Sequence, residues 1–302
     1  GTGVKVDANV TGSASIGLYS EGILKVKEAN IKTNDGAINF FANGANGSTD
    51  GRIEIGITGG TGAGTTTTGE KSLLFYTKDK GRIILNDNLA ATIKGNTDST
   101  KRGTAFYYQG SNYSNFGFTD VQNWAKTTFG DGTSTLNKLT LTMDPNSRLF
   151  VASDVFMNLT DTNPDPTSPT SVVNALGLNG ISGSNYKTFM LYLSKLKIDQ
   201  AVNLDDTTGL YKQLEIANSS IENADIITGT QVNQVAIAQE NGSDSDGNPY
   251  KAEKVTLTNS AAGKITLTGD GSTGIYAKRG DILNYGIIDV AKNSTAIYLV
   301  ED

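Results

Sequence analysis

The sequence predicts an all-β fold, a right-handed parallel β-helix (β-solenoid) with inserted loops or short helices. Three observations predict this fold class. The chain has 302 residues and is rich in glycine, with 35, and poor in proline, with 5. Short alternating apolar segments are separated by Asn-Gly, Asp-Gly and other turn sequences. Similar segments recur at both ends of the chain with a period of about 22 residues, which is typical of repeat proteins.

The repeat consists of a short strand, a turn, and a second strand that ends in an aromatic or aliphatic pair. Phe41 follows Tyr19 by the same interval as Tyr298 follows Tyr276. One such unit cannot bury its apolar face alone, but it can do so when stacked on its neighbours. The tyrosines at this position, with Tyr76, are therefore expected to stack between units. An antiparallel β-sandwich is the alternative, because its turns recur at similar intervals.

Corners between the strands are expected where glycine follows Asn or Asp, because such pairs accept a positive φ. The expected corners are Asp35-Gly36, Asn43-Gly44, Asp50-Gly51 and Asp270-Gly271.

The domain organisation predicted is a single segment over 1–302, interrupted by insertions at approximately 109–137 and 158–213. The first insertion contains a candidate short helix over 119–130, with capping residues at both ends. In the second, the apolar run 189–196 fits either a strand or an amphipathic helix, because periodicity does not decide so short a run. Repeats begin and stop abruptly at the termini, so we expect the chain to be part of a longer protein.

Composition excludes several kinds of chemistry. The chain has no histidine and no cysteine, which excludes Ser-His-Asp and Cys-His catalysis and His-based metal sites. The net charge is −6, and no basic stripe is present, so nucleic acid and anionic membranes are poor partners. We therefore predict that the protein is not an enzyme and needs no cofactor.

The recurring endings resemble a known family. Gly-Leu-Tyr (17–19), Gly-Ile-Tyr (274–276) and Ala-Ile-Tyr (296–298) are similar to passenger repeats of large bacterial autotransporters. The stretch 274–298 most resembles the giant fusobacterial outer-membrane adhesins. The resemblance covers both ends, about a quarter of the chain. It implies a type V secreted passenger on the bacterial cell surface, linked to the outer membrane only through a C-terminal barrel outside this sequence.

The same resemblance implies adhesion to a host-cell surface protein or glycan receptor, or to another bacterium. The leading hypothesis is a binding protein whose insertions form the recognition surface. One alternative is a purely structural stalk. Another is a polysaccharide-degrading enzyme, which needs acids clustered on adjacent units. The candidate carboxylates Asp205, Asp206 and Asp289 do not form such a column in the sequence pattern.

Aromatic residues are dense around the first insertion. Because Tyr and Trp are favoured in recognition, we predict a ligand-binding role for some of them. These residues are Tyr108, Tyr113, Phe116, Phe118 and Trp124. The alternative is that they pack as a small core beneath their own insertion.

Two short motifs suggest further sites. Asp244, Asp246 and Glu253 resemble part of a calcium loop, although the first ligand position falls on a glycine and the alternative is a solvated polar loop. The tripeptide 279–281 has the integrin-binding sequence Arg-Gly-Asp, and its alternative is a charged corner between two strands.

Overall fold

The computed structural model describes residues 3–44, 51–117, 120, 121, 124, 125, 138–160, 176, 178, 180–206, 214–240 and 255–300. The described residues form two compact units, which are treated separately below. Unit 1 comprises 1–111, 118–152 and 169–190, and unit 2 comprises 112–117, 153–168 and 191–302. Strands β11, β13 and β15 contribute residues to both units.

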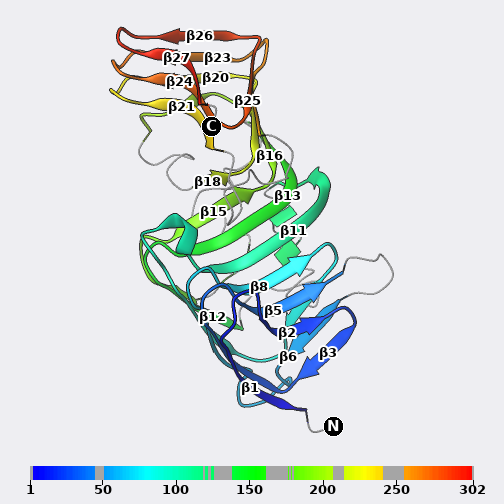
Figure 1. The fold of residues 1–302 in the computed structure, drawn as a ribbon. Coiled ribbons are helices and arrows are strands. Elements are labelled where there is room, and N and C mark those ends of the chain that lie inside the picture. The colour runs from blue at the N-terminus through cyan, green and yellow to red at the C-terminus, as the bar shows by residue number, and fades with distance from the viewer. Residues whose placement is uncertain are drawn as a thin grey trace. The chain divides into compact units, whose positions relative to one another are not determined.

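Unit 1 is built from short strands and one 3₁₀ turn (Figure 1). They are β1 (Lys5–Val10), β2 (Ile16–Ser20), β3 (Ile23–Val26), β4 (Glu28–Thr33), β5 (Ile38–Asn43), β6 (Arg52–Ile55), β7 (Gly64–Thr67), β8 (Leu73–Lys78), β9 (Arg82–Leu85), β10 (Leu89–Ile93), η1 (Ser99–Lys101), β11 (Thr104–Asn115), β12 (Leu139–Met143), β13 (Arg148–Thr160), β14 (Gly180–Ser182) and β15 (Lys187–Tyr192).

Unit 2 continues the same alternation of short strands and turns (Figure 1). Its strands are β16 (Lys195–Asp199), β17 (Val202–Asn203), β18 (Leu214–Ala217), β19 (Ser220–Asn223), β20 (Ile226–Gly229), β21 (Val235–Glu240), β22 (Thr256–Asn259), β23 (Lys264–Leu267), β24 (Thr273–Lys278), β25 (Asp281–Asn284), β26 (Ile287–Val290) and β27 (Thr295–Val300).

Every third strand belongs to the same sheet, except at β10-β12-β14, where every second strand does. In unit 1 the sheets run β1-β4-β7-β10-β12-β14, β2-β5-β8-β11 and β3-β6-β9. In unit 2 they run β16-β19-β22-β25, β17-β20-β23-β26 and β21-β24-β27. Neighbouring strands pair in parallel, which confirms the all-β parallel prediction and excludes the antiparallel sandwich. We call three consecutive strands, one from each sheet, a layer.

The predicted repeat spacing corresponds to the pairing register. Tyr19 pairs with Phe41, and Tyr276 pairs with Tyr298. Their ring centroids are 5.1 Å and 5.7 Å apart, respectively. In unit 1 the row continues from Phe41 to Tyr76 at 4.2 Å. The prediction that these tyrosines stack between layers is confirmed.

Segments of very different length, which contain strands of the other sheets, separate paired strands. Val6 of β1 pairs with Ala29 of β4 across a short segment, whereas Leu89 of β10 pairs with Leu139 of β12 across a segment more than twice as long. The register is kept because the extra residues lie between the strands and leave the alternation inside each strand unchanged.

A residue in the left-handed region marks one corner of most layers. Its φ is +74° at Gly36 and Gly271, as predicted for these two glycines. The same corner is formed without glycine elsewhere, at Ala14, Lys71, Asn146, Asn185, Asn233 and Asn293. The corner predicted at Asn43-Gly44 was wrong, since Gly44 does not have a positive φ. Asp50 of the predicted Asp50-Gly51 corner lies outside the described residues. Glycine is required at Gly51 because a Cβ there would lie 2.0 Å from the carbonyl oxygen of Asn43.

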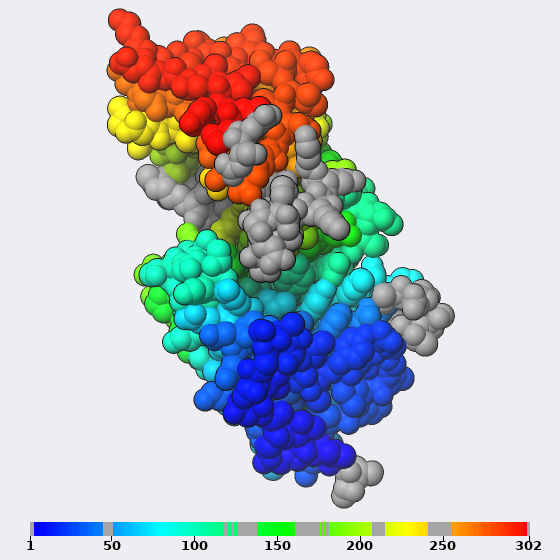
Figure 2. Space-filling view, viewed as in Figure 1, coloured from blue at the N-terminus to red at the C-terminus, as the bar shows by residue number. Residues whose placement is uncertain are grey.

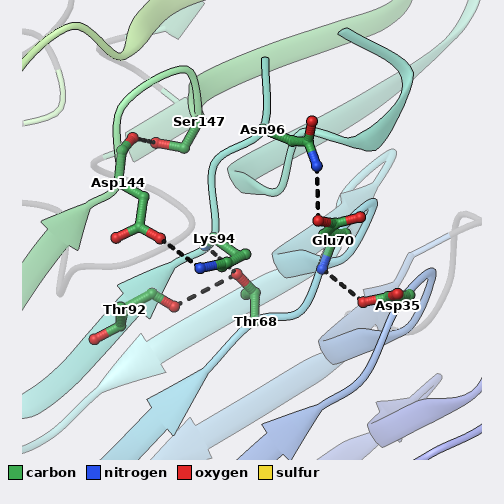
Figure 3. A network of polar contacts seen from close by, with 8 residues as sticks. All are labelled: Asp35, Thr68, Glu70, Thr92, Lys94, Asn96, Asp144 and Ser147. Atoms are coloured by element: carbon green, nitrogen blue, oxygen red, sulfur yellow. Dashed lines mark hydrogen bonds and ion pairs between the residues drawn. The ribbon is translucent and has the colours of Figure 1, made fainter. Parts of the chain in front are cut away.

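Polar side chains join the corners of successive layers in unit 1, and Figure 3 shows this network. Asp35 Oδ1 accepts a hydrogen bond of 3.0 Å from the backbone N–H of Glu70. Glu70 Oε1 accepts one of 2.7 Å from Asn96 Nδ2. Further along, Lys94 Nζ lies 3.4 Å from Asp144 Oδ2. These contacts fix each corner against the next and satisfy groups that the strand ladders leave out.

Inward side chains form columns of like residues. Phe40, Phe75 and Phe106 are buried and stack at centroid distances of 5.4 Å and 5.7 Å. Phe150 and Phe189 form a second stack at 5.5 Å. Such columns arise because parallel in-register pairing places equivalent residues of successive layers beside one another.

The two predicted insertions differ in structure. In the first, β11 extends to Asn115, and the described residues 120, 121, 124 and 125 have helical backbone. In the second, the described residues 180–206 form β14 to β17, which pair with strands of neighbouring layers. The run 189–196 is strand in β15 and β16, which are separated by a corner at 193–194, where Leu193 has a φ of +48°. Within the two ranges, residues 118, 119, 122, 123, 126–137, 161–175, 177, 179 and 207–213 lie outside the described residues.

Candidate binding groove

The outer face of the β1-β4-β7-β10-β12-β14 sheet carries two columns of mostly polar residues. Alternate residues of a strand point outward, and the pairing register aligns them across the sheet. The first column is Asp7, Asn30, Thr65, Ala90, Thr140 and Gly180. The second is Asn9, Lys32, Thr67, Thr92, Thr142 and Ser182. The face therefore offers hydroxyl and amide groups at intervals of about one strand spacing, ~4.8 Å.

A glycine-rich loop over 56–64 forms a wall beside the first column. Its backbone is left-handed at Gly56, Gly59, Gly62 and Gly64, with φ between +75° and +128°. Asp87 holds the loop, because its Oδ2 accepts a hydrogen bond of 3.0 Å from the N–H of Gly62. The other oxygen of Asp87 accepts one of 2.7 Å from the N–H of Asn88.

Loop and sheet together enclose an open groove of about 570 Å³. Its floor is formed by Asn30, Thr65, Ala90 and Thr140, and Glu28 lies at its rim. This volume lies within the range of roughly 300–1,000 Å³ that is typical of ligand sites in proteins. The floor is unusually polar for such a site, so it suits a ligand that is itself rich in hydrogen-bonding groups.

Asn30 is held rigidly at the centre of the polar groups. Its Nδ2 donates hydrogen bonds of 2.8 Å to Asp7 Oδ1 and to Glu28 Oε1. Its Oδ1 accepts one of 2.8 Å from the backbone N–H of Thr65. Since both ends of the amide are engaged, its orientation is fixed before any ligand binds, which lowers the entropic cost of binding.

Glu28 supplies a carboxylate to the groove. The hydrogen bond from Asn30 and the ammonium group of Lys5, 3.1 Å away, lower the pKa of Glu28 below its ordinary value. Glu28 therefore remains a carboxylate near neutral pH and acts as a hydrogen-bond acceptor. Among the described residues, no group of three or more carboxylates is placed to hold a metal ion.

The aromatic residues predicted as a binding site lie mainly in packed positions. Trp124 is buried, with its ring centroid 6.0 Å from Phe106 and 5.0 Å from Phe150. Its Nε1–H donates a 3.0 Å hydrogen bond to Thr77 Oγ1. Tyr108 packs at 6.3 Å from Trp124, and partial burial raises its pKa. These two side chains complete the core of unit 1, so little of their surface is accessible to a receptor.

Of the remaining predicted aromatic residues, Tyr113 and Phe116 belong to unit 2. In unit 2, Phe116 is buried, and its N–H donates to the carbonyl oxygen of Phe156 at 2.8 Å. Tyr113 is half-buried and left-handed, with a φ of +51°. Lys195 Nζ lies 4.0 Å from the centroid of its ring, in cation–π geometry. Phe118 lies outside the described residues.

Of the two short motifs predicted as sites, the structure describes only the second. Asp244, Asp246 and Glu253 lie outside the described residues. In the Arg-Gly-Asp tripeptide, Arg279 forms a left-handed corner with a φ of +58°, and Asp281 begins β25.

Two of the candidate carboxylates have defined places in unit 2. Asp205 accepts hydrogen bonds from the N–H and hydroxyl of Thr230 and from Gln234, which hold its pKa below the ordinary value. It therefore closes a turn between layers. Asp289 lies on β26, paired with Thr266.

The sequence interpretation missed the groove. Thr-x-Thr at 65–67 and 140–142 and the glycine-rich stretch 56–64 are visible in the sequence. Their meaning depends on the register, because Thr65 and Thr140 share a column only through Ala90 of β10.

Comparison with protein-family models, with curated proteins and with solved structures finds no match for the chain. No helix in the described part of the chain is both long and apolar enough to span a membrane.

Proposed function

We propose that this chain is a segment of a right-handed parallel β-helix that belongs to a secreted passenger on a bacterial surface, where it acts as an adhesin. The β-helix is supported by the recurrence of every third strand in the same sheet and by parallel pairing. It is also supported by the left-handed residue at the same corner of most layers. The autotransporter assignment is based on the repeated Gly/Ala-Ile/Leu-Tyr endings.

The adhesive function is assigned to the groove of unit 1, and its outward column of polar residues is the observation that carries the proposal. The groove presents the hydroxyls of Thr65 and Thr140, the carboxylate of Glu28 and backbone groups of a glycine loop. Sugars present closely spaced hydroxyl groups that both donate and accept hydrogen bonds, as threonine hydroxyls do. The receptor class we propose is therefore a glycan on a host cell or another bacterium.

Glycan arrays followed by calorimetry with the purified chain test this function. Thr65→Val and Thr140→Val each remove one hydroxyl from the groove floor at nearly constant volume. Losing one hydrogen bond costs about 0.5–1.5 kcal/mol, so we expect each variant to weaken binding by about 2- to 12-fold. Thr266→Val is the matched control, because Thr266 lies on β23 in unit 2.

The results distinguish a wrongly placed site from a wrongly assigned function. Unchanged affinity in both groove variants would move the site elsewhere on the chain. Failure of the chain to bind any glycan or any host or bacterial surface protein would contradict the adhesin and favour a structural stalk.

A further inference from the structure

Two hydroxyl groups on the groove floor are free to bind a ligand. The side chains of Thr65 and Thr140 are exposed, and neither hydroxyl has a hydrogen-bond partner among the described residues. Both residues pair with Ala90 of β10, which lies between them. The two threonines are therefore two strand spacings apart, ~9.6 Å. A single pyranose ring is shorter than this distance, so one sugar cannot bind both hydroxyls.

Ala90 makes the middle of the floor apolar. Its side chain is exposed and places one methyl group between the two threonines. A sugar ring carries C–H groups on its faces and hydroxyl groups around its edge. A ring above Ala90 would pack its C–H face on the methyl group, while the neighbouring sugars of a chain reach Thr65 and Thr140. The floor therefore fits linked sugars that run across the strands.

The groove extends one strand further, to β4. Asn30 lies beside Thr65, whose N–H donates to Asn30 Oδ1, and Glu28 is on the same strand as Asn30. The floor from Asn30 to Thr140 spans three strand spacings, ~14 Å. Consecutive sugars of an extended chain advance by about one such spacing each, so about three sugars fill the floor.

The groups that could hold a negatively charged sugar are already engaged by carboxylates of the chain. In the glycine-rich loop, the N–H of Gly62 donates to Asp87 Oδ2. On β1, Lys5 Nζ lies 3.1 Å from Glu28 Oε1 and 3.7 Å from Asp7 Oδ1. In Figure 2, the dark blue part of the chain, which includes β1, lies at the surface of unit 1. The ammonium group of Lys5 is therefore shared between two acids beside the groove.

The charged residues that line the groove are both acidic. They are Glu28 and Asp87. Lys32 lies on the same outer face, next to Thr67 in the second column, but it does not line the groove. A ligand with carboxylate or sulfate groups would therefore meet like charges, which weakens its binding. A neutral sugar avoids this repulsion and can donate its hydroxyl protons to the two carboxylates.

We propose that the groove binds an extended chain of uncharged sugars across β4, β7, β10 and β12, and that its acids exclude chains carrying carboxylates or sulfates. The proposal rests on the glycan-binding function proposed above. Thr65 and Thr140 bind two sugars of the chain, and Ala90 supports the ring between them. Glu28 and Asp87 set the charge preference.

A glycan array that carries each neutral chain beside its sialylated or sulfated counterpart tests the charge preference. The neutral member of a pair is expected to bind at least about 3-fold more tightly at low salt, and the difference should shrink as salt is added. Glu28→Gln removes one negative charge at nearly constant shape and should reduce the preference. Glu54→Gln is the matched control, because Glu54 also pairs with a lysine, Lys25, but lies on β6 outside the groove.

Calorimetry with fragments of the neutral chain that binds best on the array tests the length. Affinity is expected to rise by about 2- to 12-fold at the length that first engages both threonine hydroxyls. It should level off beyond about four sugars, where the floor ends. Ala90→Leu fills the space between the threonines and should weaken binding of a three-sugar fragment by at least about 10-fold. Ala261→Leu is the matched control, at an exposed turn of unit 2.

The results separate this proposal from the function on which it rests. Acidic chains that bind as tightly as their neutral counterparts, or a single sugar that binds with full affinity, would overturn the proposal and leave glycan binding in place. An unchanged preference in Glu28→Gln or unchanged affinity in Ala90→Leu would overturn it as well. Binding of no sugar at all would contradict the glycan-binding function, and this proposal with it. If circular dichroism shows that a variant is unfolded, the salt dependence and the fragment series of the unmodified chain decide.

Discussion

The side-chain nitrogen of Asn223 donates a 2.9 Å hydrogen bond to the side-chain oxygen of Asn259, and both residues are fully buried. Asn259 in turn donates to Asn284 Oδ1 at 2.8 Å. These residues end β19, β22 and β25, so they form a ladder of amides along one corner of unit 2. The amides of Asn223 and Asn259 gain these hydrogen bonds in a place that water does not reach.

Replacing the central amide should destabilise unit 2. Asn259→Ala leaves the buried nitrogen of Asn223 without its acceptor, which costs about 1–3 kcal/mol of unfolding free energy. Chemical denaturation followed by circular dichroism measures the change. Asn284→Ala is the control, since Asn284 is exposed and its loss should cost less. Equal effects of the two substitutions would argue against a role for the buried ladder.

Removing the only tryptophan should destabilise unit 1. Trp124 contacts Phe106 and Phe150 and hydrogen bonds to Thr77, so Trp124→Ala opens a cavity and is expected to cost about 3–5 kcal/mol. Denaturant unfolding followed by circular dichroism measures this loss. Tyr285→Ala, at a residue that is 67% exposed, should change stability by less than about 0.5 kcal/mol. A small effect at Trp124 together with lost ligand binding would instead support its predicted recognition role.

The conformation of the loop that forms the wall of the groove should require glycine at position 64. Gly64 has a φ of +112°, and a Cβ there would lie 2.3 Å from the carbonyl oxygen of Ala29. Gly64→Ala is therefore expected to lower thermal stability, by about 1–3 kcal/mol, and to weaken ligand binding by displacing the loop. Gly22→Ala is the control, because no atom lies within 4 Å of a Cβ at Gly22. Similar melting temperatures for both variants would contradict the close approach at Gly64.

Alkaline pH should weaken the fold through Tyr76. Burial, and to a lesser degree the charge of Asp79, raise the pKa of Tyr76 from 10.0 to about 12. The folded state therefore retains the phenolic proton after the unfolded state has lost it. The contribution of Tyr76 to stability is complete below pH 10 and is lost between pH 10 and pH 12.

Tyr76→Phe removes this titration and should flatten the fall of stability in that window. Denaturant midpoints measured between pH 8 and pH 12 test this expectation. Tyr285→Phe is the control at an exposed tyrosine. If the wild type and Tyr76→Phe lose stability in parallel, another group must control the alkaline transition.

The stacking of layers was predictable from the sequence because a few residue types determine it. The interval from Tyr276 to Tyr298 corresponds to an actual pair, and Gly36 and Gly271 form the corners that Asp-Gly sequences indicate. Corners such as Lys71 were not predictable, because hydrogen bonds between layers impose a left-handed backbone on an ordinary residue. The N–H of Lys71 donates to the carbonyl oxygen of Lys101 at 3.0 Å.

The binding site was less predictable from the sequence than the stacking of layers, because it depends on packing and on the pairing register. Tyr108 and Trp124 have the residue types of a recognition surface, but whether such rings face solvent or core depends on what packs around them. Conversely, Thr65 and Thr140 look ordinary in the sequence and become part of one surface only through pairing with β10. A site whose residues are distant in sequence can be predicted only when the pairing register of the strands is known.

The pairing of β10 with β12 across a long segment, in the same parallel register that β1 and β4 reach across a much shorter one, has a practical meaning for engineering. The strands, β11 (Thr104–Asn115) included, act as fixed docking points, so additional residues are tolerated where they lie outside the strands. Epitopes or binding peptides of different lengths grafted between β11 and β12 should be displayed without redesign of the scaffold, provided that the buried Trp124 is kept. The same tolerance would allow natural variation to replace one exposed segment at a time while the stacked strands stay unchanged.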